Sequence, residues 1–240
     1  MSAISRTMSS TASCEVIGEL EVVRNARARR VTLSFNPTSG RARLVLPRRA
    51  GLARALAWAE GKADWLAEQR ARLPEPRPFA PGAVLPVADC SLHIVREEGA
   101  RRALVRDDDR LLVAGPEETI ARRVEAWLRR ESLALLTTET AEFAAKAGVT
   151  VTRVAVGDPR GRWGSCASSG AIRYSWRLLL APGWVRRATV AHEVAHRVHM
   201  NHGAAFHALV AALLGDDPAP ARAWLRNHGA GLHWYGRSSG

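Results

Sequence analysis

The sequence predicts an α+β fold, in which a β-rich N-terminal region with a helix precedes a larger region where strands come before helices. Apolar and polar residues alternate with a period of two between residues 20 and 46, and short apolar runs recur between 83 and 114. From residue 116 onward, apolar residues mostly follow helical spacing. Strands and helices that are segregated along the chain favour α+β over a doubly wound sheet, in which they alternate.

The composition is that of a folded globular protein. The 240 residues are 47% hydrophobic and 24% charged, and this length allows a sizeable core in one large domain or two small ones. No run approaches the roughly 18 consecutive apolar residues of a transmembrane helix, so no membrane association is expected. Residues 1–15 are Ser-rich without an apolar central run, which excludes a secretory signal and predicts a disordered tail.

The net charge of +12 raises the possibility of a polyanionic partner. Only two of the 35 basic residues are lysines, and the arginines form small scattered groups rather than one tract. This distribution favours solvated basic faces over a dedicated binding groove, and it leaves nucleic acid open as a partner.

Three cysteines, Cys14, Cys90 and Cys166, are odd in number and far apart. They suit a reducing compartment better than a disulfide framework, so we expect a cytoplasmic protein. None belongs to a CxxC pair, which excludes a cysteine-based zinc knuckle. Cys166 has no obvious partner base, and we expect a small buried residue rather than a nucleophile.

Residues 16–80 are predicted to form a β-hairpin region with one helix. The segments RVTLSF and RARLVLP alternate on either side of NPTSG, where Gly40 supplies the turn. Residues 52–73 follow with apolar side chains near helical spacing. Four prolines in LPEPRPFAPG then break regular structure, so we expect a linker or long turn before a domain over residues 81–236.

That domain is expected to begin with short strands and a long helix, and no internal repeat is evident in the chain. The strands are predicted at residues 83–87, 91–95, 102–106 and 110–115. The helix is predicted over residues 116–147, and two glutamates lie in its first turn, where the helix dipole favours acidic side chains.

A strand, a hairpin and three further helices are predicted after the long helix. The strand is VTRVAV, and the hairpin turns at SSG. The helices are expected from about Trp184 to near Asn201, over residues 204–214 with Gly215 as C-cap, and over residues 219–229, closed by Gly229.

The first of these helices carries the motif HEVAH. His192 and His196 lie four residues apart and share one helical face, so both imidazoles can reach one metal ion. Zinc takes nitrogen ligands at about 2.0 Å in a tetrahedral array, and a catalytic site keeps one position open for water, which Glu193 can address. The alternative is an ordinary His-rich helix, which does not explain why five of the eight histidines fall between residues 192 and 207.

A third protein ligand is required, and three histidines are candidates. His199 shares the helical face, but it lies about 10 Å along the axis from His192, too far for one ion to bind both. His207 lies on the next helix. His202 lies where the chain is expected to turn back toward the metal, so we predict His202 as the third ligand.

Two acidic residues are the remaining alternative. Asp216 and Asp217 could supply a carboxylate ligand of the kind that some zinc sites use. They lie in a turn between Gly215 and Pro218, which makes them weaker candidates than His202.

Around these residues the chain resembles the YgjP-like zinc metallopeptidases, which are related to the SprT and WLM groups of HExxH zincins. The resemblance is carried by RWGSCASSGAIRYSWRLLLAP, by VAHEVAH and by NHGAAF. The segments RRVTLSF and GRARLVLP also look like the start of that family, so the similarity spans nearly the whole chain. The chain departs from the family pattern at Ser175, Gly203 and His207, and none of these is a predicted ligand.

The resemblance implies a zincin-like domain whose HExxH helix packs on a small antiparallel sheet. Carried over to this sequence, it implies zinc bound by His192, His196 and His202, with Glu193 as the catalytic carboxylate. By analogy with zincins, the RWGSC hairpin is the candidate to pair with an extended substrate peptide.

Four other residues of the matching segments have mainly structural interpretations. Trp163 and Trp176 are expected to fill the core beneath the metal helix rather than contact substrate. Arg162 and Arg177 either bind substrate or hold the hairpin in place.

Two functions are compatible with these features. The first is a zinc-dependent peptidase that acts on protein or peptide substrates through a zinc-activated water and Glu193 as general base. The second is a basic module, DNA-associated or protein-binding, whose zinc is structural or only latently proteolytic. A complete set of three histidines and one glutamate favours the peptidase, because a structural zinc has no use for an open position and a spare carboxylate.

Overall fold

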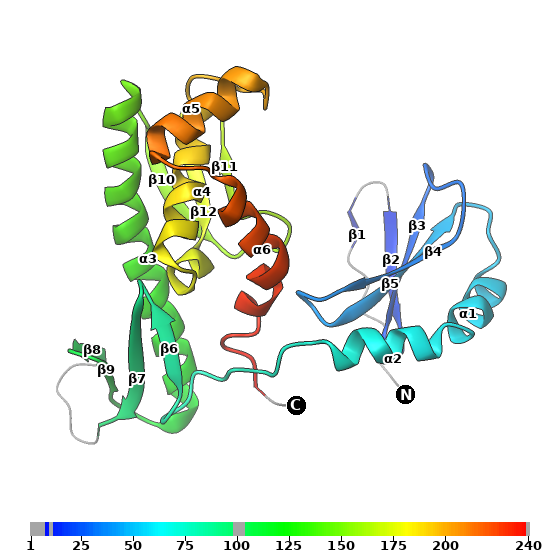
Figure 1. Cartoon of the computed structure of the whole chain (residues 1–240). Coiled ribbons are helices and arrows are strands. Elements are labelled where there is room, and N and C mark those ends of the chain that lie inside the picture. The colour runs from blue at the N-terminus through cyan, green and yellow to red at the C-terminus, as the bar shows by residue number, and fades with distance from the viewer. Residues whose placement is uncertain (1–7, 10–11, 98–103, 239–240) are drawn as a thin grey trace. The chain divides into compact units, whose positions relative to one another are not determined.

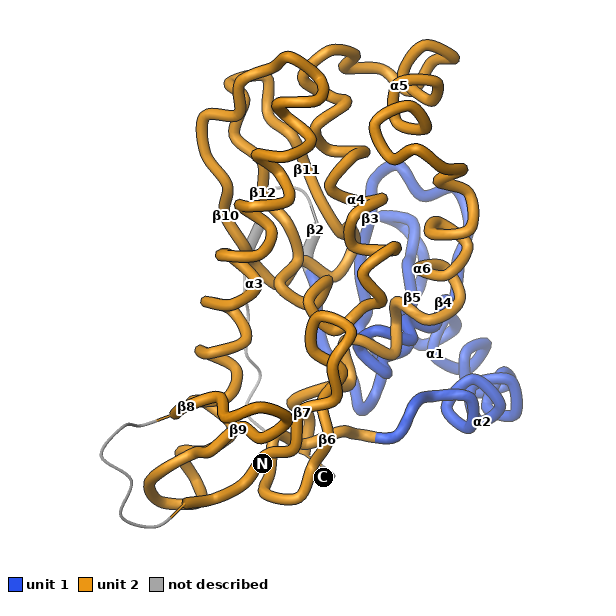
Figure 2. Tube along the Cα trace, turned by 60° about the vertical axis from the view of Figure 1, so that its left-hand side comes forward, with its two compact units in different colours: residues 1–75 blue, residues 76–240 orange. Residues whose placement is uncertain are grey.

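A computed structural model of the chain describes residues 8–9, 12–97 and 104–238. The chain forms two compact units, residues 1–75 and residues 76–240 (Figure 1, Figure 2). Both units combine helices with small sheets, which confirms the predicted α+β class. The predicted tail over residues 1–15 lies mostly outside the described residues, and within it residues 8–9 and 12–15 belong to strands.

Unit 1 contains a five-stranded sheet in the order β1-β2-β3-β5-β4. The strands are β1 (Met8–Ser9), β2 (Ala12–Ile17), β3 (Leu20–Asn25), β4 (Thr32–Asn36) and β5 (Arg41–Pro47). β4 and β5 form the predicted hairpin, and Gly40 before β5 has a φ of 71°, a left-handed value that favours glycine. β3 and β5 run parallel, whereas the other neighbours are antiparallel.

Two short helices complete unit 1 where the sequence predicted one. α1 (Leu52–Glu60) and α2 (Ala63–Ala71) are separated at Gly61, so the prediction of one continuous helix over residues 52–73 is wrong. Glycine is a poor helix former, and here it ends α1. The core of this unit packs α1 on one face of the sheet and consists of Val22, Leu44, Leu46, Ala55 and Ala59.

Unit 2 begins with a four-stranded sheet in the order β6-β7-β9-β8. The strands are β6 (Val84–Val87), β7 (Cys90–Arg96), β8 (Leu104–Asp107) and β9 (Arg110–Val113). All four match predicted strands, although the start of the third predicted strand lies outside the described residues. β7 and β9 run parallel, and β6–β7 and β8–β9 are antiparallel hairpins.

The long helix α3 (Glu117–Ala147) confirms the helix predicted over residues 116–147. Ile120 and Val124 in its first half belong to the core cluster of the β6–β9 sheet. Leu136 and Phe143 in its second half belong to a separate cluster. α3 therefore connects the two halves of unit 2. Among the described helices, none combines the length and apolar character needed to cross a membrane.

A third sheet and a 3₁₀ helix follow α3. The sheet has the order β10-β12-β11 and consists of β10 (Arg153–Gly157), β11 (Gly164–Cys166) and β12 (Ala171–Ser175). β11 and β12 form the predicted antiparallel hairpin, whereas β10 runs parallel to β12. The sheet is therefore mixed, which corrects the expectation of a small antiparallel sheet. β11 occupies one edge of this sheet. The 3₁₀ helix η1 (Trp176–Leu180) is entirely buried.

Three helices complete unit 2: α4 (Gly183–Ala195), α5 (Ala204–Leu214) and α6 (Ala219–Leu232). α4 packs against α3, α5, α6 and β11. It ends at Ala195 rather than near Asn201, which corrects the prediction. α5 and its left-handed cap at Gly215 are as predicted. α6 continues past Gly229 to Leu232, so the prediction that Gly229 closes this helix is wrong. Gly229 instead allows close approach to Trp163.

Candidate metal centre

Three predicted ligands meet at the end of α4. His192 lies in the last turn of α4, His196 follows it directly, and His202 precedes α5. Their ligand nitrogens all lie within 4.8 Å of one another, and the Nε2 atoms of His192 and His202 are 3.2 Å apart. Two zinc–nitrogen bonds of about 2.0 Å at a tetrahedral angle place their nitrogens about 3.3 Å apart. This arrangement could therefore hold one metal ion.

The end of α4 fixes how His196 is oriented. The chain turns after Ala195, and Nδ1 of His196 lies 3.1 Å from the carbonyl oxygen of His199. Because a carbonyl only accepts hydrogen bonds, Nδ1–H donates and Nε2 is left free for a metal. His199 thus acts through its backbone, and its imidazole is not part of the cluster.

A buried aromatic ring lies beneath the three imidazoles. The Phe206 ring centroid lies 4.9, 4.6 and 4.7 Å from those of His192, His196 and His202. Phe206 is fully buried, so its ring limits the orientations that the imidazoles can take. Phe206 lies in the segment NHGAAF, and no role was predicted for it from the sequence. Its spacing of four residues from His202 is the signal that could have identified it.

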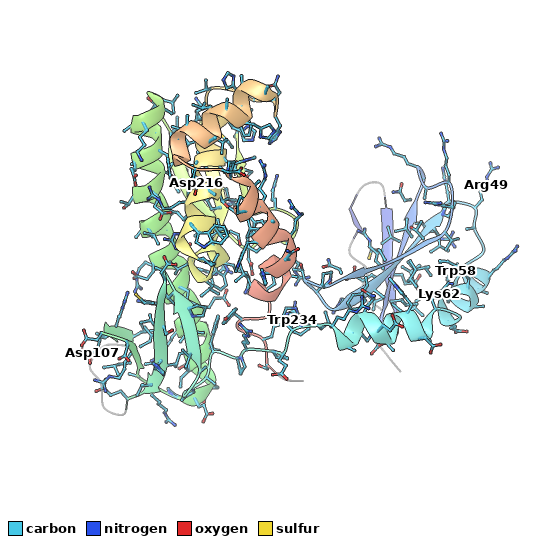
Figure 3. All side chains as sticks on the ribbon, in the orientation of Figure 1. Arg49, Trp58, Lys62, Asp107, Asp216 and Trp234 are labelled. Atoms are coloured by element: carbon cyan, nitrogen blue, oxygen red, sulfur yellow. The ribbon has the colours of Figure 1, made fainter. Side chains whose placement is uncertain are left out.

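The other candidate ligands lie outside this cluster. His207 is exposed, and its ring centroid is 6.4 Å from that of His202. Asp216 and Asp217 lie in the turn between α5 and α6, where Figure 3 labels Asp216. Among the described residues, the cluster of possible metal ligands is limited to the three predicted histidines.

Glu193 is buried beside this cluster. Its carboxylate faces β11, and a Cβ atom at Gly164 would lie only 2.4 Å from Oε1 of Glu193. Glycine at position 164 therefore allows the edge strand to pass the carboxylate, which any other residue would displace. This role of Gly164 was not predicted from the sequence, although glycine inside a strand commonly marks such a close approach.

Burial shifts the pKa values of Glu193, His192 and His196 in the direction that favours the neutral form of each side chain. Burial raises the pKa of Glu193 to about 7, and the nearby Arg162 guanidinium partly opposes that rise. Burial, together with the neighbouring imidazoles, lowers the pKa of His192 to about 4. Burial also lowers the pKa of His196. Neutral imidazole is the form that binds metals, so no proton need be removed from His192 at neutral pH.

The structure distinguishes the roles of two arginines that the sequence left open. Arg177 is buried and donates two hydrogen bonds to Asp158, at 2.7 and 3.0 Å, and two more to the carbonyls of Leu232 and Tyr235. Burial would raise the pKa of Asp158, but the hydrogen bonds from Arg177 outweigh it and lower the pKa. Arg177 therefore anchors the C-terminal segment. Arg162 is exposed and lines a cavity beside Glu193.

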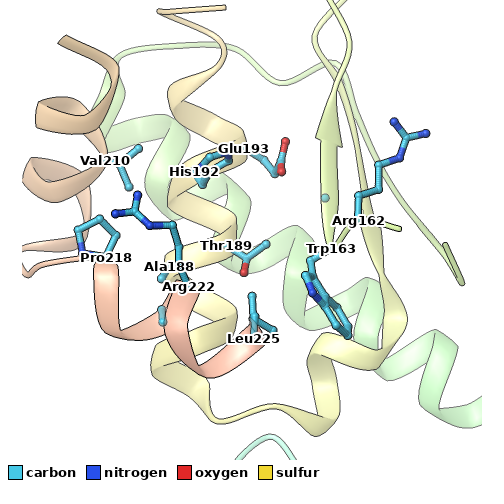
Figure 4. A pocket seen from close by; sticks show the side chains of 12 residues that line it. Arg162, Trp163, Ala188, Thr189, His192, Glu193, Val210, Pro218, Arg222 and Leu225 are labelled. Atoms are coloured by element: carbon cyan, nitrogen blue, oxygen red, sulfur yellow. The ribbon is translucent and has the colours of Figure 1, made fainter. Parts of the chain in front are cut away.

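The two tryptophans also differ. Trp176 is fully buried, which confirms its predicted place in the core. Trp163 is half-buried and lines the same cavity as Arg162, so it is not confined to the core (Figure 4). Cys166 is half-buried, and burial raises the pKa of its thiol, which disfavours a nucleophilic role.

Comparisons with known proteins agree with the geometry at the level of the family. The family model described as YgjP-like, metallopeptidase domain, matches residues 29–228. No curated protein and no solved structure matches the chain significantly. The match covers most of both units and includes the three clustered histidines and Glu193. The chain therefore belongs to the YgjP-like metallopeptidase family.

Proposed function

We propose that the protein is a zinc-dependent metallopeptidase that hydrolyses peptide bonds in protein or peptide substrates. The observation that supports this most directly is the convergence of the His192, His196 and His202 nitrogens beside the buried Glu193 carboxylate. Three imidazoles leave one position of a tetrahedral zinc ion for water or substrate. A carboxylate that does not belong to the cluster is then available for proton transfer.

A zinc ion held by the three imidazoles would act as a Lewis acid on the substrate carbonyl. It would also lower the pKa of a water, so that this water loses a proton more easily and becomes a better nucleophile. Glu193 accepts the proton of that water and delivers it to the departing amine. Gly164 keeps the carboxylate of Glu193 in place by leaving room for it beside β11. The Nδ1–H bond from His196 to the His199 carbonyl orients its imidazole for this chemistry.

The substrate backbone is proposed to pair with β11. This strand lies at the edge of its sheet, it passes the carboxylate of Glu193, and its outer side is not paired with another described strand. An extended peptide on that edge would bring a peptide bond to the catalytic carboxylate. We place the reaction in the cytoplasm, because all three cysteines are unpaired.

The experiment that tests this function compares the wild type with Glu193→Gln. Both proteins are loaded with zinc, their metal content is measured, and hydrolysis of casein and of a mixed peptide set is followed. The variant should bind one zinc per chain like the wild type and lose at least about 100-fold in hydrolysis, because an amide cannot take up the proton. His202→Ala serves as a second variant and should lose the metal itself.

Equal hydrolysis by wild type and Glu193→Gln would contradict the proposed role of the carboxylate. Zinc retention without hydrolysis by the wild type would contradict the peptidase proposal and would instead favour a basic binding module with a structural metal. Salt-dependent binding to DNA would then be the feature to measure.

A further inference from the structure

A cavity of about 270 Å³ opens directly beside the candidate metal centre (Figure 4). His192 and Glu193 form part of its lining. The remaining walls come from α4, α5, α6 and the segment at the start of β11, and they are mostly apolar. The apolar lining residues are Trp163, Ala188, Val210, Pro218, Ala221 and Leu225.

The walls of this cavity are packed into the core of unit 2. Trp163 and Leu225 each pack against both core clusters, so the cavity lies where the two clusters meet. A Cβ atom at Gly229 would lie 2.7 Å from the Trp163 indole, so glycine there lets α6 close against this wall. Val210 is fully buried. The cavity is therefore a preformed apolar recess whose walls cannot easily collapse.

Two cationic side chains complete the lining. In Figure 4, Arg222 and Arg162 lie on opposite sides of the His192–Glu193 pair. Within the described part of the chain, neither guanidinium forms a hydrogen bond or an ion pair with a protein group. Other arginines of unit 2 differ in this respect, since Arg177 and Arg187 are paired with carboxylates.

An apolar recess with a free guanidinium at its wall has a definite chemical preference. The recess favours an apolar side chain, because burying that side chain removes apolar surface from water. The guanidinium favours a carboxylate, which it can bind through two parallel hydrogen bonds. Both features lie within one cavity that also includes His192 and Glu193, so one substrate can use all of them.

We propose that this cavity is a substrate subsite that accepts an apolar side chain next to a carboxylate, with Arg222 binding the carboxylate. The inference rests on the proposed peptidase function and names its substrate class. The carboxylate comes from an acidic side chain adjacent to the apolar residue or from the C-terminus of the peptide. Either source offers Arg222 the same planar pair of oxygens.

A matched peptide series tests the subsite. Two internal peptides differ only in Leu-Glu against Leu-Gln, and two shorter peptides end in Leu with either a free carboxylate or an amide. Each is assayed for hydrolysis by the zinc-loaded wild type. Each is also assayed for binding to zinc-loaded Glu193→Gln by calorimetry, which does not depend on turnover. In at least one of the two pairs, the acidic peptide should be hydrolysed about tenfold faster than its neutral partner and bound about tenfold more tightly.

Two variants at the cavity and one control locate the effect. Arg222→Gln should remove the preference for the acidic peptide, whereas Arg226→Gln should retain it. Arg226 is exposed on the same helix and does not line the cavity, so it controls for the change in net charge. Ala221→Leu narrows the recess. It should therefore reduce the binding and hydrolysis of peptides that contain leucine more than those of the same peptides with alanine in its place. Thermal unfolding confirms that each variant folds.

The outcomes separate this inference from the proposed function. Hydrolysis of acidic and neutral peptides at equal rates would overturn the subsite and leave the peptidase intact. If Arg226→Gln loses the preference for acidic peptides as Arg222→Gln does, the preference depends on net charge rather than on the cavity. That result would also overturn the subsite. An acid preference in binding that depends on Arg222 supports the subsite even if no peptide of the series is cleaved.

Discussion

Two sheets in different units of this protein share one topology. In unit 1, β2 to β5 are ordered β2-β3-β5-β4, and in unit 2, β6 to β9 are ordered β6-β7-β9-β8. Each consists of two antiparallel hairpins joined through a parallel central pair, β3 with β5 and β7 with β9. Residues 20–25 read LEVVRN and residues 92–97 read LHIVRE. Each sheet is followed by a helix.

The helices are where the two regions differ. α1 ends at Gly61 after nine residues and packs on the sheet of unit 1. α3 continues for 31 residues, and beyond the β6–β9 sheet it packs against α4. In unit 2 the helix that follows the sheet is long enough to contact α4, the helix that carries His192, whereas α1 packs on the sheet of unit 1. Helix length, rather than sheet topology, distinguishes the two regions.

The largest effect is expected at the contact between α3 and α4. Arg186 of α4 donates to both carboxylate oxygens of Glu139 on α3, at 3.1 and 3.2 Å, and both side chains are buried. Glu139→Ala leaves a buried guanidinium without this partner, so we expect a loss of about 3 to 5 kcal/mol in the free energy of unfolding. Chemical denaturation of the metal-free protein measures it.

Glu142→Ala is the matched control for this prediction. Glu142 is also on α3 and pairs with Arg187 of α4 at 2.7 Å, but both side chains are partly exposed. Water screens this exposed pair, so Glu142→Ala should lower the free energy of unfolding far less than Glu139→Ala does. Equal losses for the two variants would contradict the view that the buried pair joins α3 to α4.

A second pair of variants tests whether the two sheets differ in their relation to the metal. Leu44 and Leu111 occupy equivalent buried positions in the parallel strand pairs, opposite Val22 and Ile94. Leucine to alanine at either site should cost about 3 kcal/mol by leaving a cavity. Only Leu111→Ala should also weaken zinc retention, because its sheet belongs to the unit that carries the histidines. Metal analysis after dialysis against a chelator checks this.

The third sheet extends the comparison to the strand that lies beside the candidate site. In the β10-β12-β11 sheet, the antiparallel edge strand β11 flanks the parallel pair β10–β12. In the same way, β4 flanks the pair β3–β5 and β8 flanks the pair β7–β9. β11 passes a buried carboxylate, that of Glu193, at Gly164. Gly164→Ala should displace Glu193 and lower kcat at least about 100-fold while zinc content stays at one per chain. Normal kcat in that variant would show that the contact does not position Glu193.

The smallest expected effect concerns the pH dependence of stability. Residues 1–75 contain no histidine, whereas unit 2 buries His233, and burial lowers its pKa to about 4. Below the ordinary value of about 6.5, the unfolded state takes up a proton that the folded state does not, so stability falls as pH drops toward 4. We expect this histidine to account for about 2 kcal/mol over that window. His233→Gln should flatten the profile by that amount, and an unchanged slope would contradict it.

Much of the fold follows from local patterns in the sequence. Period-two alternation identified β4 and β5, and short apolar runs identified β6 to β9. Helical spacing identified α3 and α5 within a residue or two of their ends. Parallel pairing of β3 with β5 could not be predicted, because pairing is non-local. No internal repeat was seen in the sequence, and the topology that the two sheets share is visible only in the structure. The two segments share few identical residues, and their loops and helices differ in length.

The candidate site shows the same division. The spacing in HEVAH and the turn before α5 predicted that His192, His196 and His202 would come together, and the structure places them within reach of one ion. The predicted end of α4, near Asn201, lies several residues beyond its observed end at Ala195. The chain turns there, and His196 donates to the His199 carbonyl, a contact that the residue pattern does not reveal. Glycine inside a strand can indicate a close approach at Gly164, but it does not identify the partner, because Glu193 lies 29 positions away in the sequence.

The most direct measurement is an anomalous diffraction map of crystals of the zinc-loaded protein, recorded at the zinc absorption edge. We predict one peak per chain within about 2.1 Å of Nε2 of His192, His196 and His202, with the Glu193 carboxylate close by but outside bonding distance. A peak held by other residues, or no peak between these three imidazoles at full zinc loading, would contradict the account.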